Sequence, residues 1–273
     1  MGNSAHKHMV KRFKGEPISL TSGKRTRHCS EEPLAEEEIN MKIIKLRLIF
    51  FSLLCVLAPI NAQARQESVC YGTTEKGRIE NAWQLPNSGD NFTAYSRIGV
   101  SAGRNYVHST IYAVVLDTYN DLNQHCPQSK YVYGETGWKN GGRFRPHKTH
   151  QNGLSVDFFV PVKDETGKSV PLPTGPLNKF GYAIGFNSQG KYKNFTIDFE
   201  AMAAHLLALK KAADQRGVKI WRVIFDNELQ KPLFQTSKGK GLQAQLPFSK
   251  KKPWVRHDEH YHVDFIVPCK EYR

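Results

Sequence analysis

Residues 257–264 read HDEHYHVD, and this short stretch near the end of the chain decides the fold. Side chains alternate between the two faces of a β-strand, so His260, His262 and Asp264 share one face. The residues between them are apolar or aromatic and belong to the opposite face. The pattern therefore predicts a strand over 260–267 that packs on a core through one face and carries a polar site on the other.

A second histidine segment, residues 147–157, reads HKTHQNGLSVD. Ser155 and Asp157 share one face of a strand predicted over 154–162, and Gly153 lets the backbone turn just before it. Pro146 and Gly153 argue against a helix, so this segment is not the helical zinc-binding arrangement H-E-x-x-H.

The two segments together offer the ligands of a metal site. They hold five of the eight histidines in residues 65–273, whereas His108, His125 and His205 lie on predicted helices and are interpreted as structural. Two neutral imidazoles and one carboxylate are the usual composition of an open, catalytic zinc site. Such a site can hydrolyse an amide without a serine or cysteine nucleophile.

The remaining patterns predict an α+β fold. Apolar residues recur at three- and four-residue intervals over 104–126 and 198–216, which is typical of amphipathic helices. Further strands are predicted over 131–133 and 218–225, while the Pro-, Gly- and Lys-rich stretches are interpreted as surface loops. The loops predicted in this way are 163–195 and 227–256. We expect a single domain with a central antiparallel sheet, flanked by helices, that carries the zinc site.

The N-terminal part of the chain resembles an export signal. Residues 41–64 begin with Met41 and a basic segment, continue with a short apolar run and end in Ala-Gln-Ala at Ala64, which predicts a cleaved signal peptide. The apolar run is shorter than the roughly 20 residues that span a bilayer, so no stable membrane insertion is expected after cleavage. The polar residues 1–40 are interpreted as the product of an upstream start codon or as a disordered extension. The folded domain is expected over 65–273.

Charge and cysteines limit the partners and the compartment. The chain carries a net charge of +14, and residues 65–273 carry 29 basic and 19 acidic residues. An exported basic protein without a nucleic-acid-binding motif is expected to bind an anionic cell-surface polymer rather than nucleic acid. Cys70 and Cys269 lie near the two ends of the domain and Cys126 lies between them. Spacing does not fix the pairing, but export permits a disulfide, and we predict Cys70–Cys269 with Cys126 as a free thiol.

The two extended motifs resemble a known family. H-x-x-G-x-S-x-D followed by H-x-H is similar to the metallopeptidase group of lysostaphin, D-Ala-D-Ala peptidases and hedgehog domains. Gly-Gly-Arg-Phe at 141–144 before His147, and Arg-His-Asp at 256–258 before His260, resemble the penicillin-insensitive murein endopeptidases within that group. The likeness also includes the stretch 77–95 and runs over most of 70–269.

The resemblance implies a role for each matching residue. His150, Asp157 and His262 match the zinc ligands, and His260 matches the catalytic histidine. His147 and His257 match two further active-site histidines. Glu259 stands where D-Ala-D-Ala dipeptidases have a catalytic base, so Glu259 and His260 are alternatives for that role.

The resemblance also implies a reaction. It is the zinc-dependent hydrolysis of D-alanyl–meso-diaminopimelyl cross-links in peptidoglycan, in the periplasm and without inhibition by penicillin. Two alternatives remain open: a D-Ala-D-Ala carboxypeptidase, and a zinc-bearing cell-wall binding module without hydrolysis. The sequence does not indicate an oligomeric state.

Overall fold

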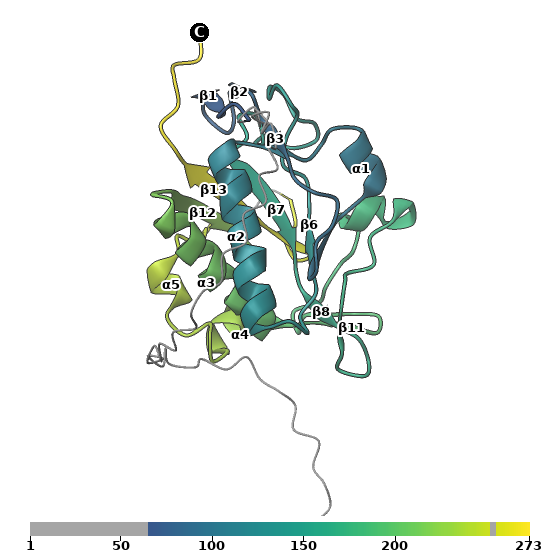
Figure 1. Cartoon of the computed structure of the whole chain (residues 1–273). Coiled ribbons are helices and arrows are strands. Elements are labelled where there is room, and N and C mark those ends of the chain that lie inside the picture. The colour runs from purple at the N-terminus through teal and green to yellow at the C-terminus, as the bar shows by residue number, and fades with distance from the viewer. Residues whose placement is uncertain (1–64, 252–254) are drawn as a thin grey trace, which may run out of the picture.

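The predicted strands of the two histidine segments lie side by side in one central sheet. The computed structural model describes residues 65–251 and 255–273, so the predictions for 1–40 and for the signal peptide 41–64 lie outside the described residues. The sheet has five strands in a fixed spatial order (Figure 1). They are β12 (Lys219–Ile224), β13 (His260–Ile266), β7 (Ser155–Phe159), β6 (Tyr131–Tyr133) and β4 (Phe92–Ala94). Every neighbouring pair is antiparallel except β4 and β6, which run parallel.

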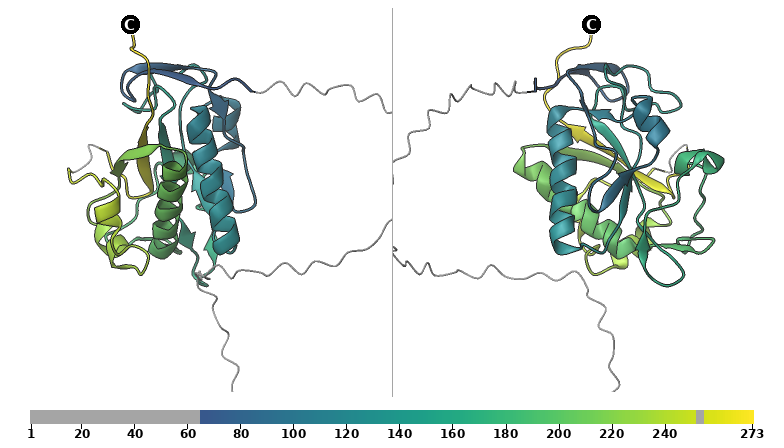
Figure 2. Two further views of the ribbon diagram at one scale, coloured as in Figure 1. Left: turned by 60° about the vertical axis from the view of Figure 1, so that its left-hand side comes forward. Right: turned by 45° about the vertical axis from the view of Figure 1, so that its right-hand side comes forward.

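Two long helices cover one face of this sheet. They are α2 (Ser109–His125) and α3 (Phe199–Gln215), which pack against each other on the same side of the strands (Figure 2). The Asp198 carboxylate caps α3 by accepting a hydrogen bond from Ala201 N at 3.1 Å. Gly217, at φ +66°, ends the helix with the left-handed turn that glycine favours. The predicted α+β class and the single domain are confirmed.

The core explains why the polar face of the sheet remains available. Tyr261 on β13 and Phe158 on β7 are buried, and the ring of each contacts the His205 ring of α3 at a steep angle. The side chains that alternate with them must therefore emerge on the face away from α2 and α3. That open face is where both histidine segments meet.

The stretches predicted as surface loops contain more structure than expected. Residues 163–195 contribute to a four-stranded sheet and contain a short 3-10 helix. Residues 227–256 contain two short helices. The sheet comprises β10 (Lys191–Tyr192), β11 (Phe195–Ile197), β8 (Val162–Lys163) and β9 (Ser169–Val170). The helices are η1 (Pro176–Gly181), α4 (Gln230–Gln235) and α5 (Leu242–Gln245). The prediction was wrong here because two- and three-residue strands are too short to show a period.

The remaining small elements all precede α2 in the chain. They are β1 (Val69–Gly72), β2 (Gly77–Glu80), β3 (Trp83–Gln84), β5 (Tyr106–Val107) and α1 (Arg97–Ser101). None of the helices within 65–251 and 255–273 has the length and hydrophobicity needed to cross a membrane.

A disulfide joins the two ends of the domain. Cys70 on β1 is bonded to Cys269, which follows β13, and 199 positions separate them in the sequence. The predicted pairing is therefore confirmed. The prediction of a free thiol at Cys126 was wrong, because this residue is also disulfide-bonded. A central cysteine gives no sequence signal of its own pairing.

Candidate active site

The pairing register of β7 and β13 brings the two motifs together. His262 lies directly opposite Asp157, and Asp264 lies directly opposite Ser155. Directly opposed residues of an antiparallel pair place their side chains on the same face, a few ångströms apart. Two residues separated by more than a hundred positions in the chain thus become neighbours in the site.

Three side-chain atoms converge at one point above these strands. His262 Nδ1 lies 2.8 Å from Asp157 Oδ1, and His150 Nε2 lies 3.3 Å from the same oxygen. All three side chains are buried. His150 Nδ1 lies 3.0 Å from the carbonyl oxygen of Thr136, to which it donates, so the other ring nitrogen carries a lone pair. His150 Nε2 has no hydrogen-bond partner, which is the arrangement expected of a metal ligand.

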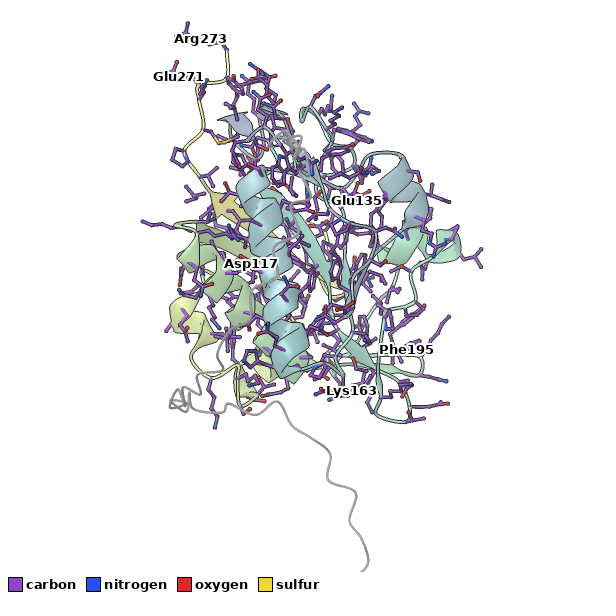
Figure 3. All side chains as sticks on the ribbon, in the orientation of Figure 1. Asp117, Glu135, Lys163, Phe195, Glu271 and Arg273 are labelled. Carbon is purple, nitrogen blue, oxygen red and sulfur yellow. A yellow bond between two sulfur atoms is a disulfide. The ribbon has the colours of Figure 1, made fainter. Side chains whose placement is uncertain are left out.

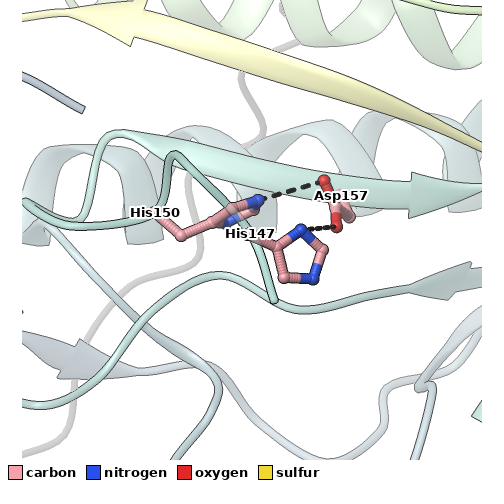
Figure 4. Close-up of side chains that lie close together, drawn as sticks. All are labelled: His147, His150 and Asp157. Carbon is pink, nitrogen blue, oxygen red and sulfur yellow. Dashed lines mark ion pairs between the residues drawn. The ribbon is translucent and has the colours of Figure 1, made fainter. Parts of the chain in front are cut away.

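His147 approaches the same carboxylate from its other oxygen. Ligand atoms of His147, His150 and Asp157 all lie within 4.8 Å of one another, and Figure 4 shows both rings facing the carboxylate. His147 Nδ1 is 3.9 Å from Asp157 Oδ2, whereas its Nε2 is 2.7 Å from Glu135 Oε2. A metal ion could therefore be held by His147, His150 and Asp157, or by His262 in place of His147. His150 and His262 both approach Asp157 Oδ1, whereas His147 approaches Oδ2.

A second layer of contacts holds His262. Its Nε2 lies 2.9 Å from Asp264 Oδ1, and that same oxygen accepts a hydrogen bond of 2.6 Å from Ser155 Oγ. Arg222 Nε donates to the other oxygen of Asp264 at 2.7 Å. Burial opposes the charge on Asp264, but His262 and Arg222 outweigh it and lower the pKa of this carboxyl to about 2. An ionised carboxylate behind a ligand histidine fixes the orientation of the ring.

Three residues expected to be catalytic lie beside the cluster. His260 Nε2 is 3.8 Å from Asp157 Oδ2, and His260 Nδ1 is 3.1 Å from Glu259 Oε1. The His257 ring lies 4.7 Å from that of His260, and its Nδ1 contacts the carbonyl oxygen of Val255. Glu259 therefore reaches the cluster through His260, and His257 packs against His260.

Burial shifts the proton affinities of these groups. It raises the pKa of the Glu259 carboxyl to about 7, and it lowers the pKa of His260 to about 4 and that of His257 to about 3. Glu259 can thus exchange a proton near neutral pH, while both imidazoles remain neutral. Groups with such shifted pKa values are typical of catalytic sites.

Two functional residues were missed by the sequence analysis. Tyr182, which follows η1, donates from its hydroxyl to Asp157 Oδ2 at 3.0 Å and accepts from Glu135 N at 2.9 Å. Glu135, just after β6, accepts from Tyr95 and pairs with Arg104 and His147. Burial opposes its ionisation, but His147 and Arg104 lower the pKa of Glu135 to about 2. The sequence offered one signal for Glu135, a glutamate two residues after the strand predicted over 131–133, and it offered none for Tyr182.

Local backbone geometry gives the cluster its close packing. His150 adopts φ +68°, a left-handed conformation that is uncommon for residues other than glycine and is found at functional sites. Gly153 also has a positive φ, and a Cβ there would lie 2.8 Å from His108 N. A Cβ on Gly134 would lie 2.9 Å from that of Asp157. Glycine at both positions permits the close approach of the chain to the site.

The cluster has the chemistry of a hydrolytic metal centre. It combines buried imidazole and carboxylate groups that could hold a metal ion, a neutral histidine beside them and a carboxyl group that titrates near neutrality. This combination on an α+β scaffold is typical of the class of metallopeptidases.

Comparison with known families agrees with that class. The model of the family described as penicillin-insensitive murein endopeptidase matches residues 70–272. The chain belongs to this family, and it is therefore a peptidase that acts on the murein of cell walls. No curated protein matches the chain.

Proposed function

We propose that the protein is an exported zinc endopeptidase that cleaves the D-alanyl–meso-diaminopimelyl cross-links of peptidoglycan. The observation that carries this proposal is the convergence of His150 Nε2 and His262 Nδ1 on Asp157 Oδ1. Two imidazole nitrogens, which are neutral when they bind a metal, and one carboxylate oxygen suit Zn²⁺ and leave a position open. In the metal-free protein burial opposes the charge on His262, but Asp264 and Asp157 raise its pKa to about 10, so binding of zinc would release a proton from this ring. Bound there, zinc supplies a Lewis acid that polarises the scissile carbonyl and activates water.

His260 and Glu259 are proposed to transfer the proton from the attacking water to the leaving amine. When the Glu259 carboxylate accepts the Nδ1 proton of His260, the lone pair of His260 lies on Nε2, toward the cluster. His260 can take a proton from the attacking water and return it to the leaving amine. In this arrangement Glu259 sets the tautomer of His260, and the lone pair on His260 Nε2 makes His260 the principal base. His147, held by Glu135, faces Asp157 Oδ2 and is a candidate to stabilise the developing charge.

The reaction is tested by digestion of intact murein sacculi with the purified protein, followed by chromatography of the muropeptides. We expect cross-linked dimers to become monomers, with chelators abolishing the activity, added Zn²⁺ restoring it and penicillin having no effect. The absence of an acylatable serine from the proposed mechanism is the reason for that insensitivity. Release of terminal D-Ala with intact dimers would indicate a carboxypeptidase, and unchanged murein with zinc loaded would indicate a binding module.

The ligand assignment predicts different results for two neighbouring histidines. His262→Ala should lose zinc, because the residue supplies a ligand nitrogen. His260→Ala should keep zinc while activity falls by about 10²–10⁴-fold, the usual contribution of a general base. Metal analysis and turnover of both variants decide this, and His147→Ala tests whether His147 replaces His262 as a ligand. Equal loss of zinc from His260→Ala and His262→Ala would contradict the assignment.

A further inference from the structure

A basic cleft opens directly beside the candidate site. It has a volume of about 530 Å³, and His147 of the candidate site is one of the residues that line it. The charged and polar residues that line it are Glu75, Arg143, Arg145, His147, Lys148 and Gln151. Three of these side chains are cationic and one is an exposed carboxylate, so the cleft favours an anionic ligand.

The backbone of this wall is fixed by contacts on its inner side. Trp138 Nε1 donates to the carbonyl oxygen of Arg143 at 3.3 Å, and Arg104 Nη2 donates to that of Arg145 at 2.9 Å. Phe144, between them, is fully buried against the rings of Trp138 and His147. Arg143 and Arg145 are therefore presented from a rigid segment, which reduces the entropy lost on binding.

Arg143 and Arg145 do not form ion pairs with other described residues of the protein. Both side chains are exposed, and within residues 65–251 and 255–273 no ion pair includes either guanidinium. The cleft's carboxylate, Glu75, instead lies 3.8 Å from Arg222 Nη2. Two planar guanidinium groups in a cleft that His147 also lines can each bind a carboxylate through paired hydrogen bonds.

We propose that this cleft is a subsite for the free carboxylates of the cross-linked peptide, bound by Arg143 and Arg145. The inference rests on the proposed function and names the part of the substrate that is recognised. In a D-alanyl–diaminopimelyl cross-link, the carbon attached to the scissile nitrogen carries a free carboxylate. When the scissile carbonyl lies at the cluster, covalent geometry keeps that carboxylate only a few ångströms from it, and the cleft lined by His147 and the two arginines adjoins the cluster. The arginines would select amides whose leaving amine bears an α-carboxylate.

Binding without turnover isolates the subsite from the chemistry. A purified cross-linked muropeptide dimer is titrated into chelator-treated protein by calorimetry, in its free form and with its carboxylates amidated. We expect Arg143→Gln and Arg145→Gln each to weaken binding of the free dimer by about three- to tenfold, in the range of one typical hydrogen bond. Amidation removes the partners of both arginines, so it should weaken wild-type binding by at least as large a factor and make it insensitive to both substitutions. Melting curves show whether the variants remain folded.

Arg216→Gln is the matched control. Arg216 also exposes its guanidinium but pairs with Asp117 on α2, on the face of the sheet opposite the site (Figure 3). It should bind both dimers as the wild type does. The proposal is overturned if wild-type protein does not bind the free dimer, if it binds both dimers equally, or if the control weakens binding as much as Arg143→Gln. Failure of the proposed endopeptidase reaction would instead appear as intact dimers in the zinc-loaded digest, with this binding pattern unchanged.

Discussion

At the scale of single residues, Tyr182 connects the two halves of the site. Its hydroxyl donates to Asp157 Oδ2 and accepts from Glu135 N, so it holds the proposed ligand carboxylate and the segment after β6 in one arrangement. A hydrogen bond to a ligating carboxylate orients it and tunes its affinity for metal. The contact requires the glycine at 134, because a Cβ there would lie 2.7 Å from the tyrosine hydroxyl.

Tyr182→Phe should weaken zinc binding by about tenfold while leaving the fold intact, because it removes only the hydroxyl. Competition with a chromophoric chelator measures the zinc affinity directly. Tyr192→Phe, on β10 of the four-stranded sheet, makes the same chemical change away from the cluster and should keep the wild-type affinity for zinc. An unchanged affinity in Tyr182→Phe would show that its hydroxyl does not position Asp157.

Sequence patterns predicted the residues of this site to different degrees. Asp157 and His262 could be predicted because strand alternation placed each on a polar face, and the resemblance then assigned a role to each. The register that sets them opposite each other depends on packing and was not predictable from either segment. Tyr182 and Glu135 were missed because each enters the site from a segment outside the helices and strands, where no periodicity marks the direction of a side chain.

At the scale of elements, the contact between α3 and β13 buries an imidazole. His205 is fully buried, its Nδ1 lies 2.8 Å from the Tyr261 hydroxyl, and its Nε2 has no partner. Burial lowers the pKa of His205 to about 3, from the ordinary value of 6.5. The helix and strand themselves were predicted from periodicity, but only their packing makes His205 resist protonation.

This burial predicts a loss of stability in acid. Below pH 6.5 the unfolded chain binds a proton at His205, whereas the folded chain does not until the pH approaches 3. The stabilisation of the folded state that comes from a neutral His205 is therefore complete above pH 6.5. It is lost progressively as the pH falls, by about 2 kcal/mol between pH 6.5 and pH 5. Urea unfolding at several pH values should show a smaller acid loss for His205→Gln than for the wild type.

The control for this prediction is His125→Gln. It removes an exposed imidazole from the end of α2 and should leave the acid loss unchanged. The wild-type protein gives an independent reading by NMR, since the ring protons of His205 should not titrate between pH 8 and pH 5. Titration of that ring near pH 6 would contradict the burial argument.

At the scale of the whole molecule, one covalent bond closes the domain near the site. The Cys70–Cys269 disulfide joins β1 to the segment that follows β13, and Asn152 contacts the Cys269 sulfur from the loop that carries His150. The class of fold was predictable from the periodicity of the helices and strands. The pairing of Cys70 with Cys269 was predicted from their positions near the two ends of the domain, although spacing alone does not fix a pairing. The small sheet and short helices were not predictable, since only contacts with the rest of the domain stabilise such short elements.

The last prediction concerns this closure. Replacing both Cys70 and Cys269 with serine frees a loop of 199 positions in the unfolded state, so the free energy of unfolding should fall by about 2–5 kcal/mol. Urea unfolding under oxidising conditions measures the difference from the wild type. Under reducing conditions the two proteins should become nearly equal, because neither then has the bond, and this comparison controls for the side-chain change. If the difference persists after reduction, the loss comes from packing of the buried Cys70 sulfur rather than from chain closure.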